Sequence, residues 1–273
     1  MAPSPPRPLG LAHFTVLDVA PQDLVPLARR TGYAAIGIRL VQAAPGSPVY
    51  SIPAGSAAMA EMRRRLDGEG IAVHDIEIAT IAPGFDPGAL APVLESAAGL
   101  GARRLSVCAD EPDRGRLTAR FAELCDLASG FGIGVDLEWM AWRAVRRLAD
   151  ALEVVTAAGR PDAGVLVDAL HLFRTGGSPV DLRAVPPGLL RSVQLCDAVA
   201  TPPVGTAAII AEARSGRLPP GEGVLGLDAL MTELPADAAL SAEVPMGTAL
   251  PPEERARRVY AATRALLERH PAG

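Results

Sequence analysis

The segment VLVDALHLFRTGG (residues 165–177) contains an apolar run that ends at two residues able to bind a metal. Val165, Leu166 and Val167 have the composition of a buried strand. Asp168 and His171 follow at the point where that strand should reach the surface. Taken singly, an aspartate at a strand end is more often a helix cap or a solvated loop residue. The function of this segment therefore depends on whether other strands deliver similar side chains to the same place.

Further strand-like runs alternate with helical patterns along the whole chain. The predicted strands cover residues 11–17, 34–40, 71–79, 104–109, 132–140, 163–169, 191–197 and 238–244. Amphipathic stretches with helical spacing cover residues 21–32, 58–70, 113–132 and 141–159. This alternation with short connections predicts parallel strands joined by right-handed crossovers. Eight such units in 273 residues predict an α/β fold, with one (β/α)8 barrel domain covering residues 1–273.

A doubly wound open sheet is the alternative arrangement of the same elements. The nucleotide-binding version of that fold carries a GxGxxG motif after its first strand, and this sequence has none there. The number of strands and the chain length favour the barrel. Two long connections, residues 41–55 and 198–223, are predicted to be binding loops or lids, with disorder as the alternative.

Composition and charge argue against several classes of function. The net charge of -5 argues against nucleic-acid binding, which usually needs a basic excess. The start, MAPSPPRPLG, lacks the apolar core of a signal peptide, and no apolar run is long enough to cross a membrane. Cys108, Cys125 and Cys196 show no CxxC spacing and are expected to be reduced thiols. We expect a cytoplasmic protein with a small-molecule substrate and no nucleic-acid or membrane partner.

Polar side chains recur on the inner face of the last four predicted strands. Alternate side chains of a barrel strand point into the barrel and out toward the helices. With the apolar residues facing out, the inward positions near the strand ends hold Glu138, Asp168, Gln194 and Glu243. A (β/α)8 barrel assembles its active site on that face, so these side chains should converge. Three clustered carboxylates raise each other's pKa, a cost that a divalent cation removes, and oxygen ligands favour Mg²⁺ or Mn²⁺.

At these residues the sequence resembles the sugar phosphate isomerase/epimerase family, the xylose isomerase-like TIM barrels. The matching segments, in order, are DLEWM, VDALHLFRTGG, VQLCDA, RLPPGEG and SAEVP. The family includes ketose 3-epimerases, inosose dehydratases and, more distantly, endonuclease IV. Endonuclease IV is a poor match, because its trinuclear zinc cluster is rich in histidine and this chain has only four histidines. Two of them, His13 and His74, lie early in their predicted strands and are expected to be structural.

The resemblance implies one divalent metal ion held by the four inward residues, with Mn²⁺ or Mg²⁺ preferred and Co²⁺ or Zn²⁺ as alternatives. In the epimerases the third ligand is typically histidine, whereas Gln194 is typical of the dehydratase-like branch. By position, His171 resembles the family's substrate-binding histidine. Arg217 resembles the arginine that contacts the substrate from the loop after strand seven. Relatives are often dimers or tetramers, so the resemblance leaves a homo-oligomer open.

Other residues near the predicted site have two interpretations each. Glu77 and Arg39 would line the substrate cavity. The alternatives are a buried carboxylate bonded to the backbone for Glu77 and a surface ion pair for Arg39. Trp139 and Trp142 flank the metal loop and would either pack on a sugar face or fill the core.

The chemistry expected of such a site is proton abstraction from a carbon next to a carbonyl, with the metal stabilising the enediolate. Glu138 and Glu243 would act as bases on opposite faces of a keto-sugar or related polyol, giving epimerisation or isomerisation. The alternative is dehydration of an inosose or dehydroshikimate-type substrate, in which His171 protonates a departing hydroxyl. A non-catalytic sugar-binding barrel is a further hypothesis, which a missing ligand would favour, and none is missing.

Overall fold

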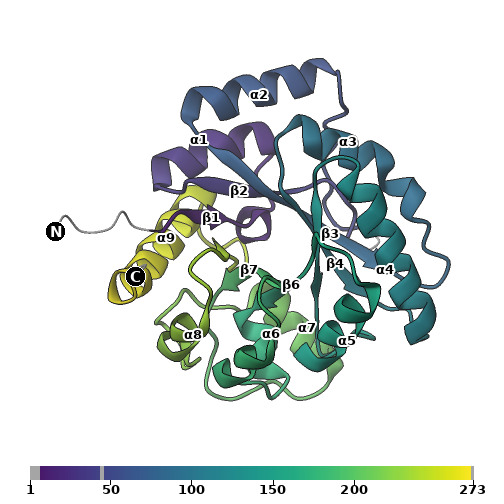
Figure 1. Ribbon diagram of the computed structural model, residues 1–273. Helices are drawn as coiled ribbons and strands as arrows, with labels where there is room; N and C mark the ends of the chain where they lie inside the picture. Colours follow the sequence, from purple (N-terminus) through teal and green to yellow (C-terminus); the bar gives the residue numbers. More distant parts are fainter. Residues whose placement is uncertain (1–6, 44–45, 272–273) are drawn as a thin grey trace.

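Eight parallel strands form a closed barrel in the order β1 to β8, with β8 paired to β1 (Figure 1). This computed structural model describes residues 7–43 and 46–271. The predicted α/β fold and the (β/α)8 barrel are confirmed. The expectation that the start is not a signal peptide rests largely on residues 1–6, which lie outside the described residues. Residues 44–45 of the connection 41–55 also lie outside them.

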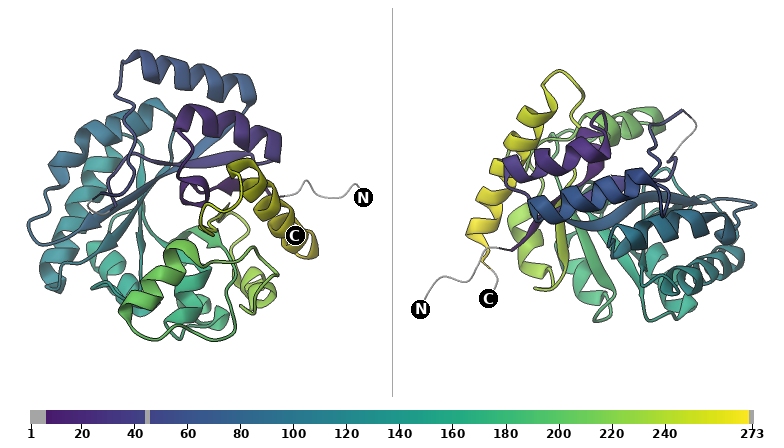
Figure 2. Two further views of the ribbon diagram at one scale, coloured as in Figure 1. Left: turned by 180° about the vertical axis from the view of Figure 1, so that it is seen from behind. Right: turned by 90° about the horizontal axis from the view of Figure 1, so that it is seen from above.

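The α-helices surround the barrel, as the views from behind and from above show (Figure 2). The strands are β1 (Leu9–Leu11), β2 (Ala35–Arg39), β3 (Ala72–Ile81), β4 (Arg104–Ala109), β5 (Gly134–Glu138), β6 (Ala163–Asp168), β7 (Leu190–Leu195) and β8 (Ala239–Ala242). The α-helices are α1 (Pro21–Thr31), α2 (Ala57–Glu69), α3 (Ala91–Gly99), α4 (Arg114–Ser129), α5 (Leu148–Ala158), α6 (Ala169–Arg174), α7 (Thr206–Ser215), α8 (Leu227–Glu233) and α9 (Pro252–Arg269). Short 3-10 helices are η1 (His13–Val16), η2 (Pro87–Leu90) and η3 (Pro179–Ala184). Within the described ranges, none of these helices combines the length and apolar character needed to span a bilayer.

The first strand ends earlier than predicted. β1 stops at Leu11 and η1 follows, so the predicted strand 11–17 is wrong beyond its first residue. The turn is held by His13, whose Nε2 lies 2.8 Å from the Val19 carbonyl oxygen and whose Nδ1 accepts the backbone N–H of Arg39 at 3.0 Å. These bonds give His13 the structural role expected of it, in a 3-10 turn instead of a strand.

The helix predicted over 141–159 is too long at its start. Residues 141–147 form turns, and α5 begins at Leu148. The Asp150 side chain accepts the backbone N–H of Arg146 at 2.9 Å, which satisfies a donor at the start of the helix. Residues 141–147 are therefore not part of the helix and form part of a wall above the barrel.

The connection 198–223 is not a continuous loop, because it contains α7. The prediction of a long unstructured connection after the seventh strand is therefore wrong in its middle. The connection 41–55 carries no helix or strand in its described part. Both connections lie after strand ends, on the side of the barrel where the candidate site forms.

A polar cluster fills the barrel interior near the amino ends of the strands. Arg104 forms an ion pair with Asp136, which also accepts the Ser192 hydroxyl at 2.7 Å. His74 Nε2 lies 3.2 Å from the Ser192 hydroxyl. Asp136 and Ser192 therefore point into the barrel, and His74 is structural as expected. The cavity described below lies at the opposite end of the barrel.

Candidate metal centre

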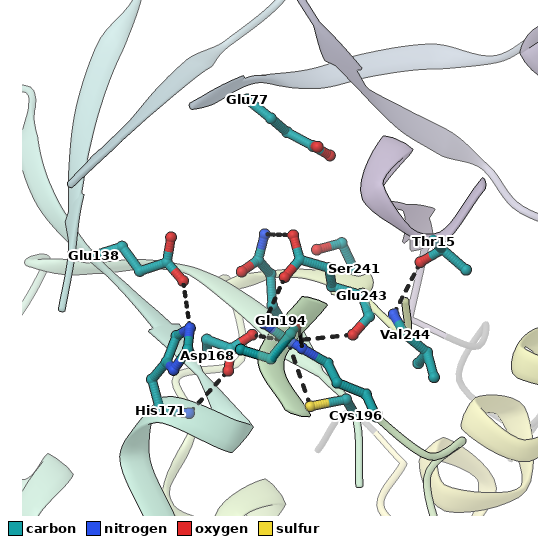
Figure 3. A network of polar contacts seen from close by, with 12 residues as sticks. Thr15, Glu77, Glu138, Asp168, His171, Gln194, Cys196, Ser241, Glu243 and Val244 are labelled. Atoms are coloured by element: carbon teal, nitrogen blue, oxygen red, sulfur yellow. Dashed lines mark hydrogen bonds and ion pairs between the residues drawn. The ribbon is translucent and has the colours of Figure 1, made fainter. Parts of the chain in front are cut away.

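The four predicted metal ligands lie at the carboxyl ends of four neighbouring strands. Glu138 ends β5, Asp168 ends β6, Gln194 lies one residue before the end of β7, and Glu243 follows β8. Asp168 is the register partner of Gln194. The Glu243 N–H donates to the Leu195 carbonyl at 3.1 Å, which extends the β7–β8 ladder. The four side chains face a common space (Figure 3).

Glu138, Asp168 and His171 form the tightest group, since one ligand atom of each lies within 4.8 Å of the others. His171 lies in α6 and is 3% exposed, so the prediction that it lies where the strand reaches the surface is wrong. The reason is that Asp168 Oδ1 accepts the backbone N–H of His171 at 2.9 Å and caps α6 directly after the strand. Asp168 is therefore a helix cap as well as a member of the cluster.

Gln194 and Glu243 are joined by a hydrogen bond that orients the amide. Gln194 Nε2 donates to Glu243 Oε1 at 2.9 Å. Gln194 Oε1 is buried, and no hydrogen-bond partner for it exists among the described residues. A buried carbonyl without a partner costs about 1–3 kcal/mol. An amide oxygen is a suitable ligand for a hard cation, so this orphaned atom fits a metal centre.

Arg217 lies between two of the carboxylates. Its Nη1 donates to Asp168 Oδ2, and its Nη2 lies 3.1 Å from Glu243 Oε2. The side chain is 2% exposed, and its Nε donates to the Ala213 carbonyl of α7 at 3.0 Å. The predicted substrate-binding arginine is therefore held rigidly at the floor of the site.

The loop that carries Arg217 is organised by Asp197, a residue that the sequence analysis did not single out. The buried Asp197 carboxylate accepts the backbone N–H groups of Ala198 and Gly221 at 2.8 and 2.9 Å. At Gly223 a Cβ atom would lie 2.3 Å from the Ala198 carbonyl oxygen, so this close approach requires glycine. The segments VQLCDA and RLPPGEG thus belong to one packed unit that presents Arg217.

The charges of the cluster leave two negative charges to be balanced. Glu138, Asp168 and Glu243 carry three when ionised, and Arg217 supplies one positive charge. Burial, followed by the charges of Glu243 and Asp168, raises the pKa of Glu138 well above its usual range. Burial raises the pKa of Glu243 to about 8, although Arg217 opposes the rise. A divalent cation would remove the imbalance without protonating either glutamate.

Asp168 and His171 respond differently to the same burial. Burial acts to raise the pKa of Asp168, but the charges of Arg217 and His171 outweigh it and the pKa is lowered. Burial lowers the pKa of His171 to about 4, so the imidazole is neutral at pH 7. Asp168 is therefore ionised at neutral pH.

The raised pKa of Glu243 predicts a pH-dependent stability for the metal-free protein. Between the usual glutamate pKa of 4.5 and about 8, the folded state binds more protons at Glu243 than the unfolded state. The free energy of unfolding of the wild type, relative to Glu243→Gln, should therefore fall as pH rises from 5 to 8. The expected slope is at most about 1.4 kcal/mol per pH unit. Urea unfolding of both metal-free proteins across this range measures it, and parallel curves would contradict the prediction.

A cavity of about 170 Å³ opens over the cluster. Its charged and polar lining includes the predicted residues Arg39, Glu77, Glu138, His171, Gln194, Arg217 and Glu243. Its apolar wall is formed by Phe14, Leu17, Ile78, Met140 and Trp142. The cavity therefore brings together every residue predicted to bind substrate, over the residues predicted to bind metal.

Arg39 and Glu77 form the wall opposite the carboxylate cluster. Arg39 is buried, its Nη2 donates to Glu77 Oε2 at 3.2 Å, and its guanidinium lies 5.1 Å from the centre of the Phe14 ring. The surface ion pair considered for Arg39 is therefore wrong. Glu77 Oε1 accepts the backbone N–H of His13 at 2.6 Å, so the backbone-bonded interpretation holds together with its place in the cavity lining. In Figure 3 Glu77 lies across the open space from the other acids.

The two tryptophans have different positions. Trp139 is fully buried in the core, whereas the Trp142 ring stands edge-on to His171 with 5.3 Å between ring centres. Arg143 and Arg214 also line the cavity, and neither is predicted to do so from the sequence. Arg143 was included in a predicted helix, and Arg214 lay in a segment predicted to be a loop. The signal available in the sequence was the position of these two basic residues. Arg143 follows the strand that ends at Glu138, and Arg214 precedes the segment RLPPGEG.

A closed barrel with buried carboxylates, a histidine and an arginine at its carboxyl end defines a (β/α)8 protein with a candidate divalent-metal centre. Residues 25–266 match the family model for the xylose isomerase-like TIM barrel proteins, and the chain belongs to this family. The resemblance predicted from the sequence is thereby confirmed. A search among curated proteins found no match.

Solved structures of similar fold include proteins with several activities. The IolI protein with a bound zinc atom has a TM-score of 0.79 at 17% identity, covering 96% of this chain and 99% of that one. The probable 3-DHS dehydratase AsbF from Bacillus anthracis has a TM-score of 0.72 at 14% identity, covering 94% and 98%. A D-allulose 3-epimerase from Methylomonas sp., in complex with D-allulose, has a TM-score of 0.70 at 15% identity, covering 97% and 99%. At these identities the likeness is one of fold.

Proposed function

We propose that this protein is a divalent-metal-dependent isomerase or epimerase of a keto-sugar or related polyol. It would abstract a proton from the carbon next to the carbonyl. The observation that carries the proposal is the pair Glu138 and Glu243, two buried carboxyl groups with raised pKa values in one cavity. A positioned carboxylate is a common general acid or base, so two of them in one cavity can serve the two faces of a bound substrate.

Glu138, Asp168, Gln194 and Glu243 would hold the cation, and the position of His171 makes it a further candidate ligand. The oxygen-rich donor set favours Mn²⁺ or Mg²⁺, whereas ligation by His171 would favour Zn²⁺ or Co²⁺. When bound, the cation would polarise the substrate carbonyl and lower the cost of the negative charge that develops there.

The protein side chains would divide the remaining work. Glu243 would take the proton from one face of the substrate. Glu138, after taking up a proton from solvent, would return it to the other face, and Glu243 would then release its own proton to solvent. Arg217, fixed by its bond to Ala213, would donate hydrogen bonds to a substrate oxygen. The neutral imidazole of His171 would bind a substrate hydroxyl, and the edge-on ring of Trp142 would limit its motion.

A dehydratase of an inosose or dehydroshikimate-type substrate is the second candidate, and Gln194 in the third ligand position favours it. Dehydration needs a group that protonates the departing hydroxyl. His171 is the predicted donor, and it lies in the cavity 3.6 Å from Glu138 Oε1. The same residues could therefore serve either reaction, and the products distinguish them.

Solvent deuterium distinguishes the two reactions directly. The protein, loaded with Mn²⁺, should catalyse incorporation of deuterium from D₂O next to the carbonyl of an accepted ketose in a panel that includes D-fructose and D-allulose. NMR and mass spectrometry would detect the exchange and the new stereoisomer. Conversion of 3-dehydroshikimate or an inosose with loss of water, and no exchange into any ketose, would replace the first proposal with the second.

A further inference from the structure

A second, outer chamber borders the cavity that lies over the carboxylate cluster, which is called the inner cavity below. This outer chamber, of about 650 Å³, shares Ala43, Trp142, Arg143 and Arg214 with the inner cavity. Its wall also includes Ile210 of α7, one turn before Arg214. A molecule seated over the carboxylates would therefore have room to extend past Trp142 and between the two arginines.

The four arginines that line the inner cavity differ in their partners. Arg39 and Arg217 each contact buried glutamate, and Arg143 donates to Asp110. The Arg214 side chain, in the last turn of α7, is exposed and makes no hydrogen bond or ion pair with any residue in the described ranges. It is an exposed cation at the mouth of the cavity whose charge is not neutralised by a neighbouring acid.

Arg143 is only partly satisfied by Asp110. Its side chain is 16% exposed, and its Nε is buried without a hydrogen-bond partner in the part of the chain that the structure describes. A guanidinium presents five N–H donors in a planar fork that matches carboxylate and phosphate oxygens. A second anion beside Asp110 would use donors that the protein leaves free.

We propose that Arg143 and Arg214 form a subsite for an anionic group on the substrate, a carboxylate or a phosphate monoester. The inference rests on the proposed function in one respect, which is that the anion belongs to the molecule occupying the inner cavity. Trp142 would separate the reacting carbons from this group, and the two guanidinium groups would bind its oxygens. The protein would accordingly prefer a keto-acid or sugar phosphate to a neutral ketose.

Calorimetric binding tests this subsite without relying on turnover. The Mn²⁺-loaded wild type would be titrated with D-fructose, D-fructuronate and D-fructose 6-phosphate, alongside Arg214→Gln. Arg29→Gln is the matched control, because Arg29 is an exposed arginine in the last turn of α1 that lies outside the cavity lining. We expect Arg214→Gln to weaken binding of at least one anionic compound by roughly tenfold, because a charge-assisted hydrogen bond is lost. Arg29→Gln should bind it as the wild type does.

The outcomes separate this inference from the proposed function. The carboxylate and phosphate sources are distinguished by which of the two compounds shows the dependence on Arg214. Equal affinity of wild type and Arg214→Gln for both anions would overturn the subsite, even if D-fructose exchanges deuterium. Binding that depends on Arg214, without deuterium exchange in any compound, would leave the subsite standing and remove the proposed isomerase activity.

Discussion

Glu243→Gln is expected to lower kcat on any accepted keto-sugar by roughly 10³-fold, within the range that general acid–base catalysis contributes. Glutamine keeps the shape of the side chain and an oxygen that can still accept the Gln194 amide, so the barrel should fold. It cannot take up a proton, and it removes one negative charge from the cation site. Steady-state kinetics with saturating Mn²⁺ measure the loss in kcat, and the deuterium exchange rate measures the proton transfer itself.

Asp136→Asn is the matched control for this substitution. Asp136 is a buried acid on the same strand as Glu138 and faces the same barrel interior, but it pairs with Arg104 near the amino ends of the strands. Its replacement should lower Tm while leaving kcat unchanged for the folded protein. If Glu243→Gln retained near wild-type turnover, Glu243 would not be the base. If both variants lost turnover equally, the effect would be one of stability.

The cluster itself was the part of the site that sequence could predict well. Glu138, Asp168, Gln194 and Glu243 each lie at the end of an apolar strand or next to it, and period-two alternation gives their direction into the barrel. Parallel strands in one closed barrel must present such residues at the same end. The alternation within each strand and the closure of the barrel therefore predict the same location for these four side chains.

Residues on the connections could not be placed in the same way. The sequence predicts His171 at the point where the strand reaches the surface, but the bond from its backbone to Asp168 turns the chain into α6, where the imidazole is buried. Arg143 lies in a segment whose amphipathic spacing is helical, yet α5 starts only at Leu148. Arg214 acquires its position from α7, a helix inside an apparently irregular segment. Periodicity carries no information about such tertiary contacts.

Phe14, in the apolar wall of the cavity, is a second residue whose position periodicity does not predict. Phe14 was assigned to a strand, where alternation would predict one face or the other. In the structure it lies in η1 and packs against the guanidinium of Arg39 while lining the cavity. A 3-10 turn has neither strand nor α-helical periodicity, so its side-chain directions depend on bonds such as those of His13.

Removal of divalent metal should abolish turnover and lower Tm by roughly 5 °C, relative to protein in metal at about 100-fold above Kd. The physical reason is that the folded site alone brings Glu138, Asp168 and Glu243 together, so the proposed cation would bind the folded state and not the unfolded chain. Chelation followed by gel filtration, with residual metal measured by atomic spectroscopy, prepares the metal-free protein. Readdition of Mn²⁺ should restore both turnover and Tm. Full turnover after verified removal would contradict the metal hypothesis.

Gln194→Leu tests the metal hypothesis through thermal stability alone. In the metal-free protein this change removes one hydrogen bond to Glu243, but it also removes a buried oxygen that has no partner among the described residues. In the metal-loaded protein it would delete a ligand. We therefore expect Gln194→Leu to reduce the metal-induced rise in Tm far more than it lowers the Tm of the metal-free protein. Asp136→Asn should lower the Tm of the metal-free and the metal-loaded protein equally. Equal metal-induced increments in wild type and Gln194→Leu would mean that the amide oxygen does not bind the cation.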